Sequence, residues 1–340
     1  MTSFLKYTFG LLAATLVAGC AAQQAPIDRV NGVSFVASRE PATQAHVNSM
    51  LAVNADFAAV MPFGFIREPN DPEIIFDTDR QWFGETRKGA KQYSKLLQEN
   101  KVRIMIKPQL WIWRGIFTGD LEMQTEEDWV RLEAQYRDFI LNYAALAEEV
   151  DAEIFCIGTE LEEFVAARPE YWDNLIAEIR GIYSGKLTYA ANWDEYPRTP
   201  FWAKLDYIGL DAYFPLSEAR DPDVEELRAG WQRWKTDIKT LSDSIARPVL
   251  FTEYGYRSMD YTAEKPWLVD SENQRVNLEA QANAMTALFQ EFWSEPWFAG
   301  GFVWKWFIHH PMSGGPDNNR FTPQNKPAEG VIRQFYRQAN

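Results

Sequence analysis

Eight short apolar runs alternate with helical segments, and this alternation restricts the possible folds more than any other feature of the chain. The runs occupy residues 32–37, 55–61, 102–107, 153–158, 187–191, 207–211, 248–252 and 300–304. Helical patterns follow them at residues 41–52, 85–100, 126–150, 168–183, 224–245, 272–293 and 328–338, and only a short segment at 197–204 follows the fifth run. Apolar runs that alternate with helices are typical of parallel strands, so the pattern predicts an α/β protein.

The number of repeats favours a closed barrel over an open sheet. Eight strand–helix units match a (β/α)8 TIM barrel, which has roughly 250 residues plus insertions, and the chain has 340 residues. A doubly wound sheet would normally have a glycine-rich phosphate turn after its first strand, and residues 37–40 (Ala-Ser-Arg-Glu) do not form one. Because no Gly-, Ser- or Pro-rich linker interrupts the series, we expect one domain over residues 32–340.

The N-terminus has the features of an export signal. Lys6 precedes an apolar run at residues 7–17 that is too short to span a bilayer. Val17-Ala18-Gly19-Cys20 resembles the bacterial lipobox, in which the cysteine is lipidated; an ordinary signal with an incidental cysteine is the alternative. We expect a lipoprotein signal peptide at residues 1–19, a lipidated Cys20 with a tether over 20–31, and a membrane-anchored protein of the bacterial cell envelope. Alanine rather than aspartate after Cys20 favours the outer membrane.

Charge and residue counts restrict the possible ligands of the protein. A formal charge of −14 without a basic cluster argues against nucleic acid. Cys156 lies inside an apolar run and is expected to be an inert core residue. The three histidines have no metal-ligand spacing, so we expect no metal. We also expect no cofactor and a monomeric protein. The 14 Trp exceed what a core usually needs, and surplus Trp commonly lines sugar sites.

Two glutamates stand at the ends of apolar runs. Glu160 ends the fourth run and Glu253 the seventh. Active sites of parallel α/β folds lie at the carboxyl ends of the strands, and paired carboxylates on opposite sides of a bond carry out glycoside hydrolysis. A structural ion pair is the alternative for either glutamate alone. If both side chains point into the barrel mouth, alternation predicts that Gly158 and Cys156 point inward below Glu160, and Phe251 and Val249 below Glu253.

The chain resembles a known family of enzymes. Its segments Ile-Gly-Thr-Glu-Leu (157–161), Ile-Gly-Leu-Asp-Ala-Tyr-Phe-Pro (208–215) and Thr-Glu-Tyr-Gly (252–255) are similar to those of clan A glycoside hydrolases, and most similar to glycoside hydrolase family 113, which contains endo-β-1,4-mannanases. The resemblance implies that Glu160 is the acid/base, that Glu253 is the nucleophile, and that hydrolysis proceeds with retention through a covalent glycosyl-enzyme. Thr159 stands where many clan members have an asparagine that contacts the sugar 2-hydroxyl.

Further residues at the same rim are candidates for substrate binding. They are Lys107, Trp111, Trp113, Thr159, Asn192, Trp193, Asp211, Tyr213, Trp304 and Trp306. By the resemblance, Tyr213 hydrogen-bonds the nucleophile, and a Trp after the eighth strand forms the floor of the cleaved sugar subsite; we favour Trp306 over Trp304 because it is nearer the mouth. A structural salt bridge is the alternative for Lys107.

The sequence therefore predicts a surface-anchored retaining glycosidase that degrades polysaccharide or oligosaccharide, with β-1,4-mannan as the favoured substrate. A hydrolase of another β-glycan, such as a glucan or an algal galactan, is the first alternative. A non-catalytic glycan-binding surface lipoprotein is the second, and the presence of both glutamates disfavours it. An aldolase or isomerase would need a phosphate site or metal ligands, which the sequence does not show. The sequence does not decide whether the enzyme cleaves within the glycan chain (endo) or at its ends (exo).

Overall fold

The computed structural model describes residues 29–268 and 275–339. The predicted signal peptide, Cys20 and the tether up to residue 28 lie outside these residues. Within the described ranges, no helix has both the length and the apolar character needed to cross a membrane.

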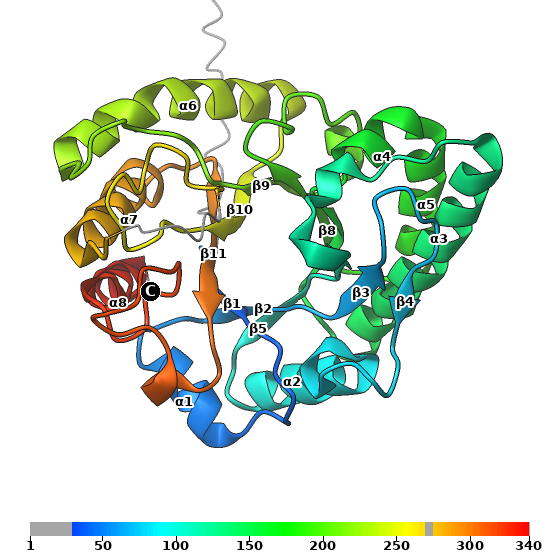
Figure 1. The fold of residues 1–340 in the computed structure, drawn as a ribbon, viewed down its shortest axis with the longest axis horizontal. Coiled ribbons are helices and arrows are strands. Elements are labelled where there is room, and N and C mark those ends of the chain that lie inside the picture. The colour runs from blue at the N-terminus through cyan, green and yellow to red at the C-terminus, as the bar shows by residue number, and fades with distance from the viewer. Residues whose placement is uncertain (1–28, 269–274, 340) are drawn as a thin grey trace, which may run out of the picture.

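Eight parallel strands close into a barrel, in the order β1-β11-β10-β9-β8-β7-β5-β2 (Figure 1). The strands are β1 (Val30–Phe35), β2 (Phe57–Val60), β5 (Arg103–Ile106), β7 (Ile154–Thr159), β8 (Lys186–Asn192), β9 (Ile208–Asp211), β10 (Val249–Tyr254) and β11 (Phe298–Trp306). Each predicted run supplies one of them, and the predicted (β/α)8 barrel is confirmed.

Helices surround the barrel (Figure 1). They are α1 (Gln44–Leu51), α2 (Arg87–Glu99), α3 (Glu126–Glu149), α4 (Glu162–Ala167), α5 (Pro169–Ile182), α6 (Val224–Ile245), α7 (Leu278–Phe292) and α8 (Pro327–Ala339). Local sequence explains several starts: the Thr125 hydroxyl accepts the Asp128 amide at the start of α3, and Pro169 occupies the first turn of α5. Helix α7 begins at Leu278, later than predicted, because the Asn277 side chain caps it there by accepting the Ala280 amide. Between β8 and β9 stands only a 3-10 turn (Trp202–Lys204).

A small second sheet, which the sequence analysis did not predict, lies beyond the barrel strands. It has the order β4-β3-β6 and consists of β3 (Phe63–Ile66), β4 (Ile75–Phe76) and β6 (Gln109–Ile112). Strands β3 and β6 run parallel, shortly after β2 and β5 in the chain. This sheet therefore extends the barrel on one side of its C-terminal end.

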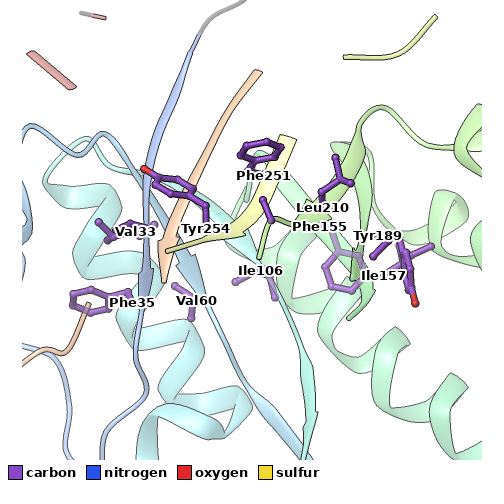
Figure 2. Packing of buried hydrophobic residues seen from close by; sticks show 14 of the residues in the cluster. Val33, Phe35, Val60, Ile106, Phe155, Ile157, Tyr189, Leu210, Phe251 and Tyr254 are labelled. Carbon is purple, nitrogen blue, oxygen red and sulfur yellow. The ribbon is translucent and has the colours of Figure 1, made fainter. Parts of the chain in front are cut away.

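The core has two parts. A small cluster fills the barrel interior and includes Ile154, Cys156 and Leu250. The larger cluster lies between strands and helices, and Figure 2 shows part of it, including Phe251. The Phe251 ring lies 4.9 Å from that of Phe292 in α7. Aromatic burial of this kind dominates core energetics.

The predicted alternation below the two glutamates is wrong in part. Phe251 and Val249 belong to the outer cluster, and the position of a Gly158 side chain faces Tyr136 and Trp172 of the helical layer. Only Cys156 points inward as predicted. The strand pairing shifts between Cys156 and Thr159 in β7 and between Phe251 and Glu253 in β10. Such bulges insert a residue and re-aim the side chains that follow.

Candidate active site

A cleft of about 710 Å³ opens at the carboxyl ends of the strands. It is bounded by the ends of β7, β8 and β10, by the second sheet and by loops. Eight predicted site residues line it: Trp111, Thr159, Glu160, Asn192, Trp193, Tyr213, Glu253 and Trp304. The fold thus brings together residues that are far apart in the chain, at the end of the barrel where active sites of this architecture lie.

Glu253 receives three hydrogen-bond donors. The residue is 5% exposed. Oε1 accepts the Lys107 ammonium and, at 2.9 Å, the Gln109 amide; Oε2 accepts the Tyr213 hydroxyl at 2.6 Å. The ammonium and the two neutral donors offset the cost of burying this side chain. The contact from Tyr213 is the one that the resemblance implied.

Lys107 and Asp211 lie beneath the cleft. Both side chains are buried, and Lys107 Nζ lies 3.3 Å from each carboxylate oxygen of Asp211. The Thr252 hydroxyl donates to Asp211 at 2.7 Å. Burial lowers the pKa of Lys107, but the carboxylates of Asp211 and Glu253 outweigh burial and raise it above its usual value. Burial and Glu253 raise the pKa of Asp211.

The structure therefore corrects the placement of Lys107 and Asp211 among substrate contacts. Neither residue is among those that line the cleft. The salt-bridge alternative describes Lys107 correctly: a buried amine needs opposite charge, and two carboxylates on neighbouring strands supply it.

Glu160 has a different environment. It follows β7, lies partly exposed in the cleft, and has φ of 50°. A left-handed backbone costs a non-glycine residue roughly 1–2 kcal/mol, so surrounding contacts must hold it. The Glu160 amide donates to the Ala190 carbonyl at 2.8 Å. Burial, together with the negative charges of Asp211 and Glu253, raises its pKa well above the usual value.

The two carboxylates are thus suited to opposite tasks. Glu253 is surrounded by donors that stabilise negative charge, whereas Glu160 is held protonated to higher pH. A carboxylate held by several donors is suited to the role of nucleophile, and a carboxyl group with a raised pKa is suited to the role of proton donor.

Aromatic side chains form walls of the cleft. Trp193 stacks on Trp267 with ring centroids 4.7 Å apart and planes 22° from parallel. Trp111 is 48% exposed. Trp304, near the end of β11, also lines the cleft, as does Phe321. Flat, partly exposed indoles are suited to stacking on the C–H faces of sugar rings.

The preference for Trp306 over Trp304 is wrong. Trp306 is fully buried, and its indole nitrogen donates to the Ser49 hydroxyl of α1 at 3.3 Å. The pairing of β1 with β11 explains why Trp304, and not Trp306, lines the cleft. Val33 pairs with Val303 but Phe35 pairs with Trp306, so β11 holds one extra residue. Because of this bulge the two Trp do not share a side.

Trp113 also lies outside the cleft lining. It stands in a 3-10 turn (Trp113–Gly115) and is 64% exposed. Its predicted role in extending the cleft has no support from the arrangement of the described residues.

Sequence reasoning missed Gln109, Thr252 and Trp267. Gln109 belongs to the unpredicted strand β6, and no local pattern marks its amide as a partner of Glu253. Thr252 precedes Glu253 and could have been suspected from its place in the Thr-Glu-Tyr-Gly segment. Trp267 follows Pro266 in a long loop, where only the general surplus of Trp gave a signal.

No group of histidine, cysteine and acidic side chains suited to a metal ion occurs among residues 29–268 and 275–339.

A closed (β/α)8 barrel with two glutamates at its carboxyl end is an architecture of glycoside hydrolases. Comparison with known families matches residues 36–326 to Glycoside Hydrolase Family 113. This match spans most of the chain, and the protein belongs to glycoside hydrolase family 113. No curated protein sequence matches it.

Solved structures share the fold. A family 113 β-mannanase from Alicyclobacillus acidocaldarius, in complex with ManMIm, is 22% identical, with a TM-score of 0.78 over 92% of this chain and 98% of that one. A family 113 β-1,4-mannanase is 20% identical, with the same TM-score over 91% and 99% of the chains. A β-glucuronidase from Faecalibacterium prausnitzii is 17% identical, with a TM-score of 0.58 over 86% of this chain and 44% of that one.

Proposed function

We propose that this glycoside hydrolase cleaves a β-linked polysaccharide or oligosaccharide with retention of configuration, and that β-1,4-mannan is its substrate. One observation carries the proposal: two carboxylates line one cleft, and one receives three donors while the other has a raised pKa. Retaining hydrolysis needs this combination of an ionised nucleophile and a protonated acid.

The first step is the attack of a Glu253 oxygen on the anomeric carbon. The glycosidic C–O bond breaks, its electron pair goes to the leaving oxygen, and Glu160 gives that oxygen its proton. In the second step Glu160, now ionised, takes a proton from water, and the water oxygen displaces Glu253 from the anomeric carbon. Tyr213 and Gln109 hold the carboxylate of Glu253 in place.

Support for mannan comes from the family and from the similar structures described as β-mannanases. Identities of 20–22% do not decide between sugars, because epimers differ by the orientation of one hydroxyl. Hydrolysis of a glucan or a galactan instead is therefore an outcome that the experiment must distinguish.

The test combines a substrate panel with stereochemistry. The barrel, produced without its signal peptide, is incubated with β-mannan, β-glucan and algal galactan, and products are separated by chromatography. Early NMR spectra should show the β-anomer first. For retention we expect the carboxyl groups of Glu160 and Glu253 to lie about 5 Å apart. A first-formed α-anomer would indicate inversion, for which the groups must be further apart.

Variants separate catalysis from binding. Glu253→Ala should lose nearly all turnover and keep its affinity for glycan, and azide should partly restore turnover by replacing the nucleophile. Wild-type rates in this variant would refute the catalytic assignment and favour a glycan-binding protein.

We also propose that Cys20 carries lipid and holds the barrel at the bacterial cell envelope, on the outer membrane. The support is the short apolar run that ends in Val17-Ala18-Gly19-Cys20. A degrading enzyme gains from display where a large polysaccharide arrives.

A further inference from the structure

A buried carboxylate outside the cleft lining is connected to the segment that carries Glu160. Glu195 lies just after β8 and is 2% exposed. Its Oε1 accepts the Tyr189 hydroxyl at 2.6 Å, and its Oε2 accepts the Asn192 amide at 2.9 Å. Both donors are uncharged. A carboxylate is costly to bury, and uncharged donors offset the cost less well than a cation does, so this site requires an explanation.

The first hydrogen bond leads to the acid. The Tyr189 oxygen accepts the amide of Leu161, the residue after Glu160, at 2.7 Å. The Glu160 amide itself donates to Ala190, the residue after Tyr189. Strand β8 therefore holds two consecutive amides at the left-handed turn on which Glu160 stands. The Tyr189 hydroxyl donates its hydrogen bond to Glu195, so the lone pairs of its oxygen stay free to accept the Leu161 amide.

The second hydrogen bond leads to another wall of the cleft. Asn192 lines the cleft at the end of β8, and its carbonyl accepts the Glu195 amide at 3.0 Å while its own amide donates to the Glu195 carboxylate. The buried Glu195 side chain thus contacts the backbone of Asn192 directly and, through Tyr189, the backbone of Leu161 next to Glu160.

We propose that Glu195, acting through the Tyr189 hydroxyl, is a positioning residue that holds Glu160 in the orientation for proton transfer to the leaving group. This inference rests on the proposed function, in which Glu160 is the acid. Neither Glu195 nor Tyr189 is among the residues that line the cleft, so both act through the backbone around Glu160.

The test uses the leaving group as the readout. A good aryl leaving group departs from its glycoside without receiving a proton. The leaving group of an oligosaccharide or an alkyl glycoside requires one. Because kcat/KM reports only the first step, in which the leaving group departs, misplacement of the acid lowers kcat/KM for the second kind of substrate only. A merely structural role, which reduces the amount of folded enzyme, lowers the rates for both kinds equally.

The variants are Glu195→Gln and Tyr189→Phe. Glutamine replaces one of the two acceptor oxygens by an NH2 donor, so the Tyr189 and Asn192 donors, which now contact different oxygens, cannot both keep their present partners. Phenylalanine removes the hydroxyl that receives the Leu161 amide. We expect kcat/KM for the unactivated glycoside to fall about ten- to hundredfold, and that for the activated glycoside to fall less than about threefold. The double variant should be no worse than the worse single variant, because both changes break the same connection.

Two further variants make the outcome decisive. Tyr183→Phe is the matched control: its hydroxyl is also buried and donates to Ala152 at 2.6 Å, before the start of β7 and away from the cleft. It should leave the ratio of the two rates unchanged. Glu160→Ala supplies the reference, because it should show the strongest preference for the activated glycoside.

Each result has one interpretation. If Glu160→Ala shows no preference for the activated glycoside, the proposed function fails. If it does show that preference while Glu195→Gln and Tyr189→Phe reduce both rates equally, or neither rate, the positioning role is overturned. Circular dichroism confirms that each variant is folded, and Tyr189→Phe serves alone should Glu195→Gln not fold.

Discussion

Replacement of Lys107 by methionine tests whether the charge arrangement beneath the cleft holds the barrel together. The ammonium is fully buried and neutralises part of the charge of two carboxylates, Asp211 and Glu253. Methionine preserves the length of the side chain and removes the charge. Removal of one partner from a buried ion pair costs about 3–5 kcal/mol, because an uncompensated charge stays behind. We expect Lys107→Met to lose this much free energy of unfolding at neutral pH.

The loss should depend on pH with a defined sign. Lys107 counteracts the burial that raises the pKa of Asp211, so its removal raises that pKa further. A carboxyl whose pKa is raised in the folded state stabilises the fold at low pH, and this contribution disappears as pH rises through the folded pKa. The variant should therefore lose more stability relative to wild type at about pH 8 than at about pH 5.

Urea unfolding at both pH values measures the effect. Lys239→Met is the control, because Lys239 is half exposed and pairs with Asp243 on the surface of α6, where such a pair contributes at most about 0.5 kcal/mol. A loss below about 1 kcal/mol for Lys107→Met, or a loss of equal size at both pH values, would refute the argument from buried charge.

Four further predictions follow from the same structure. Because the pKa of Glu160 is raised, wild-type turnover of unactivated glycosides should persist above the usual pKa range of a glutamate and fall as pH rises through the raised pKa. Turnover of an activated aryl glycoside should persist to higher pH, and pH–rate profiles that coincide for the two substrates would contradict this prediction. Trp304→Ala should reduce kcat/KM on oligosaccharides by at least about tenfold without loss of folding, since stacking on an indole contributes more than about 1 kcal/mol. Phe251→Ala should cost about 3–5 kcal/mol in thermal or urea unfolding, and a cost below about 1 kcal/mol would show that the ring is not core. Cys20→Ser should release the protein from the membrane fraction with unchanged specific activity, and a wild-type protein that is wholly soluble would contradict lipidation.

Local sequence was enough to predict the barrel. The eight strands are apolar because both their faces are buried, and the helices between them have recognisable starts at Thr125 and Pro169. Glu160 and Glu253 were found because each interrupts an apolar pattern at a strand end, where a charged group needs a reason.

Partners that lie far apart in the chain could not be predicted. Lys107 and Glu253 are separated by 146 positions, and no pattern around Lys107 distinguishes an ion pair from a contact with a sugar oxygen. Gln109 belongs to a strand of four residues, too short to give a periodic signal. The connection from Glu195 to Glu160 consists of backbone amides and one hydroxyl, which no residue pattern reveals.

The remaining errors have a common physical origin. Glu160 directly follows β7, Glu253 lies in β10 and Trp304 lies in β11. Each of these strands gains one residue in its pairing near the cleft: three residues of β7 match two of β8, two of β10 match one of β9, and three of β11 match two of β1. Below the bulges of β7 and β10, alternation sorts side chains between the barrel interior and the helical layer. At the bulges, that rule fails, and the next side chain is re-aimed. Local rules fail most often where a site imposes its own geometry. The three coincident bulges therefore mark the rim of this barrel as the part shaped for chemistry, and the outward packing of residues such as Phe251 as the part shaped for stability.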